Sequence, residues 1–347
     1  MNAATDTLER APARPAATHP THKLQLLLKR EFWEHKGGFL WAPIWAAIIS
    51  LLFTVIALGM GEYAIRHHDG FQFNGRTMLN GLDLGALTSN MSPEDMDKLA
   101  HGMSMSTASA MFWPMLVLGF VVFFYCLGSL FDERKDRSVL FWKSLPVSDR
   151  DTVASKVVSA LVVAPAISIA IGIACMIGFL LLLSVFVLIH GGNPFVLLWR
   201  PSSLLANAGV AIATLPLYAL WALPSAGWLL LCSAWAKSKP FLWAIMIPVF
   251  SGVLIYWFGL MDLFGLEQSW FWKNVVAHVL GGVFPGTWMF EMNPTMLQTR
   301  TDASLDHMAV LKGMYSVMAT PQLWVGVIAG IAMIIAAIRL RRWRDEG

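Results

Sequence analysis

Long apolar runs alternate with short polar links along most of the chain. Runs of about eighteen or more apolar residues recur, and such a run can cross roughly 30 Å of hydrocarbon as a helix. The ten-residue alternating segments of a transmembrane β-barrel are absent. The pattern therefore predicts an all-α polytopic membrane protein with six transmembrane helices, at about 39–61, 109–131, 152–189, 205–236, 240–260 and 322–340.

The third and fourth runs are longer than one plain crossing requires. The third contains Pro165, and the fourth contains Pro216 and Pro224. Because neither run has a polar turn at its centre, we expect the prolines to kink continuous helices rather than to divide hairpins. Small residues at helical spacing permit close helix packing, either within the subunit or at a dimer seam. They are Ala170, Ala174 and Gly178 in the third run, and Gly326 and Gly330 in the last.

The charges of the polar links predict the orientation. Eighteen of the 25 Lys and Arg residues fall before the first span, between Arg134 and Lys156, at 237 and 239, or from Arg339 onward. Positive residues concentrate on the cytoplasmic side of membrane proteins. Both termini and the link 132–151 are therefore expected in the cytoplasm, and 62–108 and 261–321 are expected as outer loops. Treating a long run as a hairpin would invert this bias.

Three further segments have patterns of their own. Residues 1–21 are polar and rich in Ala, Pro and Thr, which predicts a disordered cytoplasmic tail. Residues 22–38 alternate apolar and basic positions at helical spacing, which predicts an amphipathic connecting helix on the membrane surface or against a partner. Residues 269–290 are apolar but interrupted by glycine and proline, which predicts a pair of short re-entrant outer helices before the last span.

Composition supports a membrane protein and excludes several classes of function. The chain of 347 residues is 56% hydrophobic and only 14% charged, whereas soluble domains carry about 25% charged residues. Its net charge of +3 gives no support for nucleic-acid binding, and its three cysteines lie in apolar runs and are interpreted as packing residues. The spans carry almost no ionisable residues, which argues against a proton- or sodium-driven transporter.

The sequence shows no enzyme site. The phosphate-loop motif G-x-x-x-x-G-K-[ST], H-E-x-x-H and G-x-S-x-G are all absent. The neighbours His67, His68 and Asp69 offer metal-ligand atoms, but adjacent residues on a loop are more often solvated. We therefore predict no catalytic residue and no metal site in this chain.

One link, "FDERKDRSVLFWKSLPVSD" from Phe131 to Asp149, is far denser in charge than the rest. After six consecutive charges, Ser138 can start a short helix with an aromatic side, and Pro146 can stop it. A level helix with an aromatic anchor and flanking charges suits docking on another protein. A simple topology-setting cluster is the alternative, although topology alone does not require three acids.

This link resembles the cytoplasmic loop between the second and third helices of ABC exporter permeases of the type V fold, in the bacterial ABC-2-type permease family. The resemblance implies a coupling helix that docks on an ATPase, with two ATPase copies supplied as a separate chain that binds ATP and Mg. The ATPase-coupling residues implied are Asp132, Glu133, Arg134, Lys135, Asp136, Arg137, Phe141, Trp142, Lys143, Leu145 and Pro146.

The resemblance also implies a function. A homodimer, or a pair with a related permease, would export an apolar or amphiphilic substrate (lipid-like, peptide or drug) across the bacterial inner membrane. The family lines its dimer interface with the second and fifth helices. The candidate substrate path is therefore Phe123, Phe124, Tyr125, Tyr256, Trp257 and Phe258. The alternative is a membrane anchor or sensor subunit that recruits a cytoplasmic partner and transports nothing.

Overall fold

The computed structural model describes residues 20–67, 71–73, 76–78, 84–85, 91–137, 147–261, 268–292 and 306–343. This part is almost wholly helical, apart from one antiparallel hairpin of the strands β1 (Phe71–Phe73) and β2 (Arg76–Met78). Among the described residues, six helical segments are long and apolar enough to cross a membrane, as predicted. They are Gly37–Ala64, Pro93–Lys135, Asp149–Ile189, Phe195–Trp235, Pro240–Gly259 and Pro321–Trp343. The chain is a multi-pass helical membrane protein.

The first span is preceded by helix α1 (Pro20–Glu34), which overlaps the connecting helix predicted at 22–38 but begins two residues earlier, inside the predicted tail. A π-helical turn, η1 (Gly37–Trp41), leads from this region into α2 (Ala42–His67). Most of the side chains of α2 are not covered by the rest of the chain. An apolar helix exposed on most sides suits contact with lipid.

The second span begins well before its predicted start. Helix α4 (Pro93–Ser109) lies within the expected outer loop and is followed by α5 (Phe112–Gly128) and the short α6 (Phe131–Lys135). A capping box starts α4: the Ser92 hydroxyl accepts from the Asp95 N–H at 3.2 Å, and the Asp95 carboxylate accepts from the Ser92 N–H at 3.4 Å. Pro93 at the first helical position favours the same start. The hydropathy pattern did not predict α4, because many of its residues are polar.

As predicted, neither the third nor the fourth run forms a hairpin. The third consists of α8 (Asp149–Val158), η2 (Ser159–Val163) and α9 (Ala164–Ile189). It starts at Ser148, whose hydroxyl caps the Asp151 N–H at 3.1 Å. The fourth consists of η3 (Phe195–Trp199) and α10 (Leu204–Trp235), and Pro216 and Pro224 lie inside α10 without ending it.

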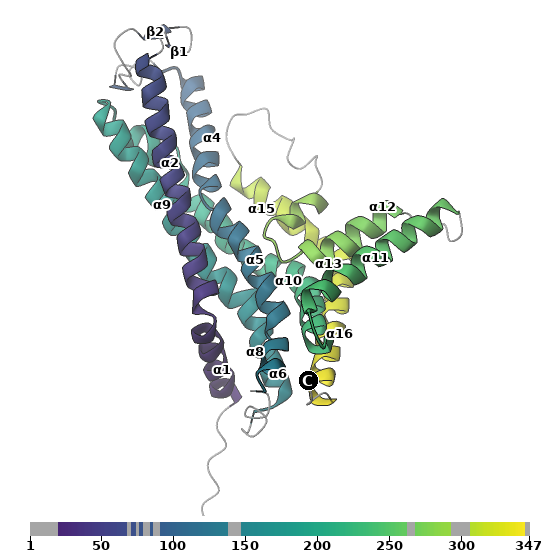
Figure 1. Ribbon diagram of the computed structural model, residues 1–347. Helices are drawn as coiled ribbons and strands as arrows, with labels where there is room; N and C mark the ends of the chain where they lie inside the picture. Colours follow the sequence, from purple (N-terminus) through teal and green to yellow (C-terminus); the bar gives the residue numbers. More distant parts are fainter. Residues whose placement is uncertain are drawn as a thin grey trace, which may run out of the picture.

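The fifth span, α11 (Pro240–Leu260), pairs with the helical run that follows it. That run comprises α12 (Gln268–Phe271), η4 (Trp272–Ala277) and α13 (His278–Gly281), and it packs along α11. Figure 1 shows α11 and α12 projecting together from the bundle. The chain then turns at Gly286, whose φ of 89° suits glycine, into η5 (Thr287–Glu291). The expected break at the glycines is present, but it separates a longer run from a single short turn.

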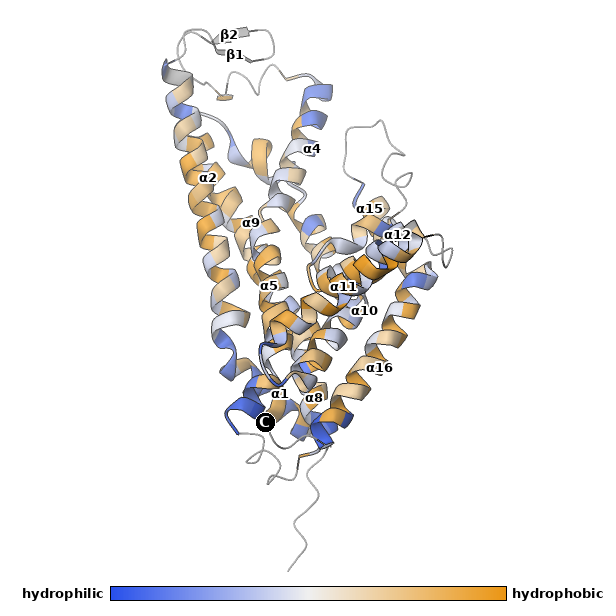
Figure 2. Ribbon diagram, turned by 45° about the vertical axis from the view of Figure 1, so that its right-hand side comes forward, coloured by the Kyte–Doolittle hydropathy of each residue, from blue (hydrophilic) through white to orange (hydrophobic). Residues whose placement is uncertain are grey.

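The last elements are α15 (His307–Ser316), η6 (Val317–Ala319) and the sixth span α16 (Pro321–Trp343). Helix α1 and the C-terminal end of α16 lie at the same end of the bundle, which we call the α1 end (Figure 1). Strongly hydrophilic residues gather there, while the helices between the two ends are mostly apolar (Figure 2). Helix α1 and the end of α16 therefore lie on one side of the bundle, and the orientation of the chain in the membrane stays a prediction.

Helices α10 and α16 make the most extensive helix–helix contact of the described residues. Their backbones approach closely where Gly227 of α10 meets Gly330 of α16. A Cβ atom on Gly227 would lie 2.7 Å from the Gly330 carbonyl oxygen, and one on Gly330 would lie 2.9 Å from backbone atoms of Leu223 and Pro224. The small-residue spacing at Gly330 therefore serves packing within the subunit.

We predict that Gly330→Ala destabilises the protein by about 1–3 kcal/mol, because the new methyl group has no flexible side chain to displace. Gly326→Ala on the same helix is the matched control, since its Cβ would meet Pro224 Cγ at an ordinary 3.5 Å. Thermal unfolding in detergent measures both. Equal unfolding temperatures for the two variants would contradict the close crossing.

Candidate functional site

Charged side chains from four helical segments meet at the α1 end of the bundle. We call this group the charge cluster: Arg30 and Glu31 of α1, Glu133 of α6, Asp149 and Lys156 of α8, and Arg341 of α16. Its three cations and three carboxylates balance formally. Because unpaired charges are costly away from water, this balance is a condition for burying the group.

The pair of Lys156 and Glu31 forms the centre of the charge cluster. Both side chains are almost completely buried, with 2% and 0% of their surface exposed. The Lys156 ammonium donates to both Glu31 carboxylate oxygens, at 3.1 and 3.4 Å, and lies 2.9 Å from Glu133 Oε1. Arg30 Nη2 donates to Glu31 Oε1 at 2.6 Å, and the Tyr125 hydroxyl donates to Glu31 Oε2 at 2.7 Å. Each oxygen of this carboxylate is therefore satisfied at least twice.

Glu133 extends the charge cluster to the last span. Its Oε2 lies 3.1 Å from Nη1 of Arg341, and Arg341 Nε lies 3.2 Å from Asp149 Oδ1. These two contacts are charge pairs without hydrogen-bond geometry at the guanidinium. Arg341 thus joins the end of α16 to α6 and to the first turn of α8.

The surroundings of Glu31 keep it ionised. Burial raises the pKa of a carboxyl group, but here the Lys156 ammonium, the Tyr125 hydroxyl and the Arg30 guanidinium outweigh it. The net result is a Glu31 pKa below its usual value. Charged Glu31 therefore stabilises the folded chain at neutral pH.

A second set of contacts fixes α6 to the end of α10. The Ser233 hydroxyl accepts from the backbone N–H groups of Leu130 and Phe131, at 3.0 and 2.9 Å. The Arg134 guanidinium donates to the carbonyls of Ser233 and Ala236, at 2.5 and 2.9 Å. A cation at the C-terminal carbonyls of a helix interacts favourably with the helix dipole. Movement of α6 is thereby linked to movement of α10.

The predicted ATPase-coupling residues divide into three groups. Glu133 and Arg134 make the internal contacts described above. Asp132, Lys135, Asp136 and Arg137 are exposed at the α1 end. Phe141, Trp142, Lys143, Leu145 and Pro146 lie outside the described residues. Partner binding by any of the eleven stays a prediction.

The residues of the predicted substrate path are not all brought together. Phe123 and Tyr125 are buried inside the chain, and Tyr125 is bonded to Glu31. Phe124 is exposed and stacks on Phe241 at the start of α11, with ring centroids 6.1 Å apart. Tyr256, Trp257 and Phe258 are exposed near the other end of α11. At 1.5 Å per residue, they lie about 22 to 26 Å along the helix from Phe241.

A groove with a cavity volume of about 490 Å³ lies beside the charge cluster. We call it the α5 groove. One wall comes from the α1–η1 junction, with Glu34, His35, Gly37, Gly38 and Phe39, and the other from one face of α5 and α6, with Phe120, Val121, Phe124, Tyr125, Gly128, Ser129 and Asp132. The spacing of these α5 and α6 positions places them on a single helical face.

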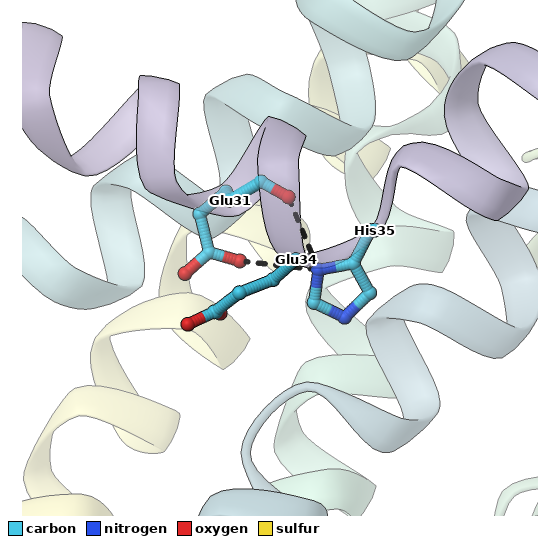
Figure 3. A group of neighbouring side chains, drawn as sticks. All are labelled: Glu31, Glu34 and His35. Carbon is cyan, nitrogen blue, oxygen red and sulfur yellow. Dashed lines mark hydrogen bonds and ion pairs between the residues drawn. The ribbon is translucent and has the colours of Figure 1, made fainter.

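Glu31, Glu34 and His35 approach within reach of a single metal ion (Figure 3). Figure 3 shows the two carboxylates beside the His35 ring, whose Nδ1 is 3.9 Å from Glu31 Oε2 and 3.2 Å from the Glu31 carbonyl oxygen. However, Lys156 and Arg30 already neutralise Glu31 at 2.6–3.4 Å. A divalent cation there would face two positive charges, so the geometry favours an ion-pair site over a metal site.

Sequence reasoning missed Glu31, Lys156 and Arg341 as members of one site. Lys156 and Arg341 were counted only as positive charges near span ends, and Glu31 was given no role, although Lys156 is the only charge in the stretch "TVASKVVSAL". Such a residue is a signal for a buried partner. The identity of the partner depends on helix packing, which the pattern does not contain.

No family model, curated protein or solved structure matches this chain. The following proposals therefore depend on the chain's own sequence and geometry.

We predict that Arg341→Met destabilises the protein by on the order of 3 kcal/mol, because Glu133 and Asp149 lose their buried cation. Arg342→Met is the matched control: it removes the same charge from the neighbouring exposed position. Chemical unfolding in detergent measures both variants. If both unfold alike, the pairing of Arg341 contributes no stability.

The lowered pKa of Glu31 predicts a dependence of stability on pH. Its contribution is fully present above the unfolded-state pKa of about 4.3, and it is lost as the pH falls through the lower folded-state pKa. Glu31→Gln should therefore unfold at a lower temperature than the wild type by a constant margin above about pH 4.5, and the margin should shrink below it. Glu34→Gln removes a half-exposed charge from the same helix and should change the unfolding temperature little. A margin that widened as the pH fell would contradict an ionised Glu31.

Proposed function

We propose that the chain is the transmembrane permease subunit of an ATP-driven exporter, working with a separate ATPase subunit at the cytoplasmic face of a bacterial inner membrane. The observation that carries this proposal is that the segment from Asp132 to Arg137 combines an exposed charged surface with contacts to other helices of the chain. Four of its charges are exposed at the α1 end, while Glu133 and Arg134 hold it to four helical segments of the chain.

This arrangement suits the transmission of force. A partner that docks on the exposed charges and on 138–146 would move α6. Glu133 would carry that movement to α1, α8 and α16, and Arg134 would carry it to the end of α10. Because the charges of the cluster compensate one another, moving one element alone would leave a buried charge unpaired. The elements are therefore expected to move together.

The energy source is placed in the partner chain. This sequence lacks the phosphate-loop motif, so ATP and Mg belong to the ATPase, whose closure on ATP supplies the movement. The role of this chain's residues is to receive the movement at α6 and to convert it into a rearrangement of the spans.

A second copy of the permease is proposed at the exposed aromatic faces of α5 and α11. Phe124, Phe241, Tyr256 and Trp257 are all exposed in the single chain, which suits either a partner helix or lipid. An apolar route between two such faces would favour apolar or amphiphilic substrates over sugars or free ions. A homodimer is the simplest assembly, because one chain then supplies both faces.

Two substitutions separate docking from transmission. Trp142→Ala removes a predicted aromatic anchor, which costs about 2 kcal/mol or more, roughly thirtyfold in affinity for the ATPase. Arg134→Ala leaves the exposed charges in place but removes the guanidinium bonds to the Ser233 and Ala236 carbonyls, which weakens the attachment of α6 to α10. In pull-downs of tagged permease, we expect Trp142→Ala to recover less ATPase, and Arg134→Ala to recover a normal amount but to lose substrate-stimulated hydrolysis.

Lys135→Ala is the matched control for Arg134→Ala, since it removes the neighbouring positive charge without any of the α10 contacts. The recovered partner must carry a phosphate-loop motif and hydrolyse ATP. Normal ATPase recovery and normal transport in the Trp142 variant would contradict docking at this link and favour the alternative that its charges only set the topology. Recovery of a partner without ATPase activity would favour the anchor or sensor alternative.

A further inference from the structure

The α5 groove has an aromatic floor below a polar rim. Phe39 is buried and packs against Tyr125, with ring centroids 4.9 Å apart, and the His35 ring lies 4.7 Å from Tyr125 and 5.8 Å from Phe39. Phe120 and Phe124 line the apolar part of the groove and are about half-exposed. Both walls include the end of a candidate span, so we expect the polar rim of the groove near the membrane surface.

Two carboxylates, Glu34 and Asp132, line the α5 groove, whereas none of its described lining residues is Lys or Arg. The three cations of the charge cluster are paired with its own three carboxylates. Glu34 and Asp132 are two further carboxylates that this pairing does not include. Glu34 shares Arg30 with Glu31 and Glu133, at 3.4 Å from Arg30 Nε. A Cβ atom on Gly128 would lie 2.7 Å from Asp132 Oδ2, so the glycine leaves room for this carboxylate beside α5.

We propose that the α5 groove binds a single-tailed cationic amphiphile, with its ammonium group between Asp132 and Glu34 and its tail along Phe120 and Phe124. Charge complementarity identifies this occupant, since the rim attracts a cation and repels anionic head groups. A volume of about 490 Å³ is within the usual range for small-molecule sites.

The proposal names the substrate class of the exporter proposed above, and to that extent it rests on the proposed function. Binding itself does not. It is measured on the permease alone in phosphatidylcholine nanodiscs, without ATPase, by equilibrium dialysis of radiolabelled dodecyltrimethylammonium. Dodecyl sulfate, which has the same tail and an opposite charge, is the ligand control.

We expect the cation to saturate one site per chain and dodecyl sulfate to show no saturable binding. Asp132→Asn should weaken binding about threefold to fivefold, and Asp132→Glu should retain most of it, because an ion pair at an exposed carboxylate contributes up to about 1 kcal/mol. Gly37→Leu should also abolish binding by filling the groove, because a Cβ atom added at Gly37 would meet nothing within 4 Å.

Gly61→Leu is the matched control for Gly37→Leu, since Gly61 is equally open but lies far along α2 from the groove. Equal binding of cation and sulfate, or no effect of Asp132→Asn, would overturn the proposal and leave an unselective apolar crevice. A change in oligomeric state with Gly37→Leu, without saturable cation binding, would assign the groove to a second copy instead. Saturable binding of the cation without ATP-driven transport would retain the site and contradict the proposed function.

Discussion

The buried ammonium of Lys156 requires carboxylates around it, and the arrangement of the α1 end follows from that requirement. Lys156 is buried and is the only charged residue between Thr152 and Ile189, so other elements must bring negative charge to it. Glu31 and Glu133 do so from two different elements, and each then requires further donors of its own: Arg30, Tyr125 and Arg341. One buried cation thereby determines where α1, α6 and α16 end relative to α8.

Packing between the helices is achieved differently where no charge is present. In the apolar part of the bundle, α10 and α16 approach through Gly227 and Gly330, because lipid offers little hydrophobic reason for helices to associate. The fold therefore combines close backbone contact in the membrane with charge pairing at one end. The backbone contact requires glycines, which have no side chain, and the charge pairing requires side chains of opposite charge at matching positions.

The amino-acid pattern predicted the six spans because hydropathy averages over many residues and tolerates local error. It also predicted that the long third and fourth runs are not hairpins, since neither run has a polar turn at its centre. It missed α4, because "SPEDMDKLAHGM" is polar although its capping box is readable. It did not pair Glu31 with Lys156, which lie 125 positions apart, because that pairing follows from tertiary packing alone.

The same limit explains the outcome for the candidate site. Treating Asp132–Arg137 as one surface run assumed that consecutive charges share an environment, but a helical turn directs neighbours in different directions. Glu133 faces the charge cluster, Arg134 faces the end of α10, and Asp132 faces the α5 groove. Within six residues, this segment contacts other helices, presents an exposed surface and lines the α5 groove. A partner bound at the exposed surface is therefore physically linked to a ligand bound in the α5 groove. This physical linkage is what a subunit that couples an external energy source to a bound amphiphile would require.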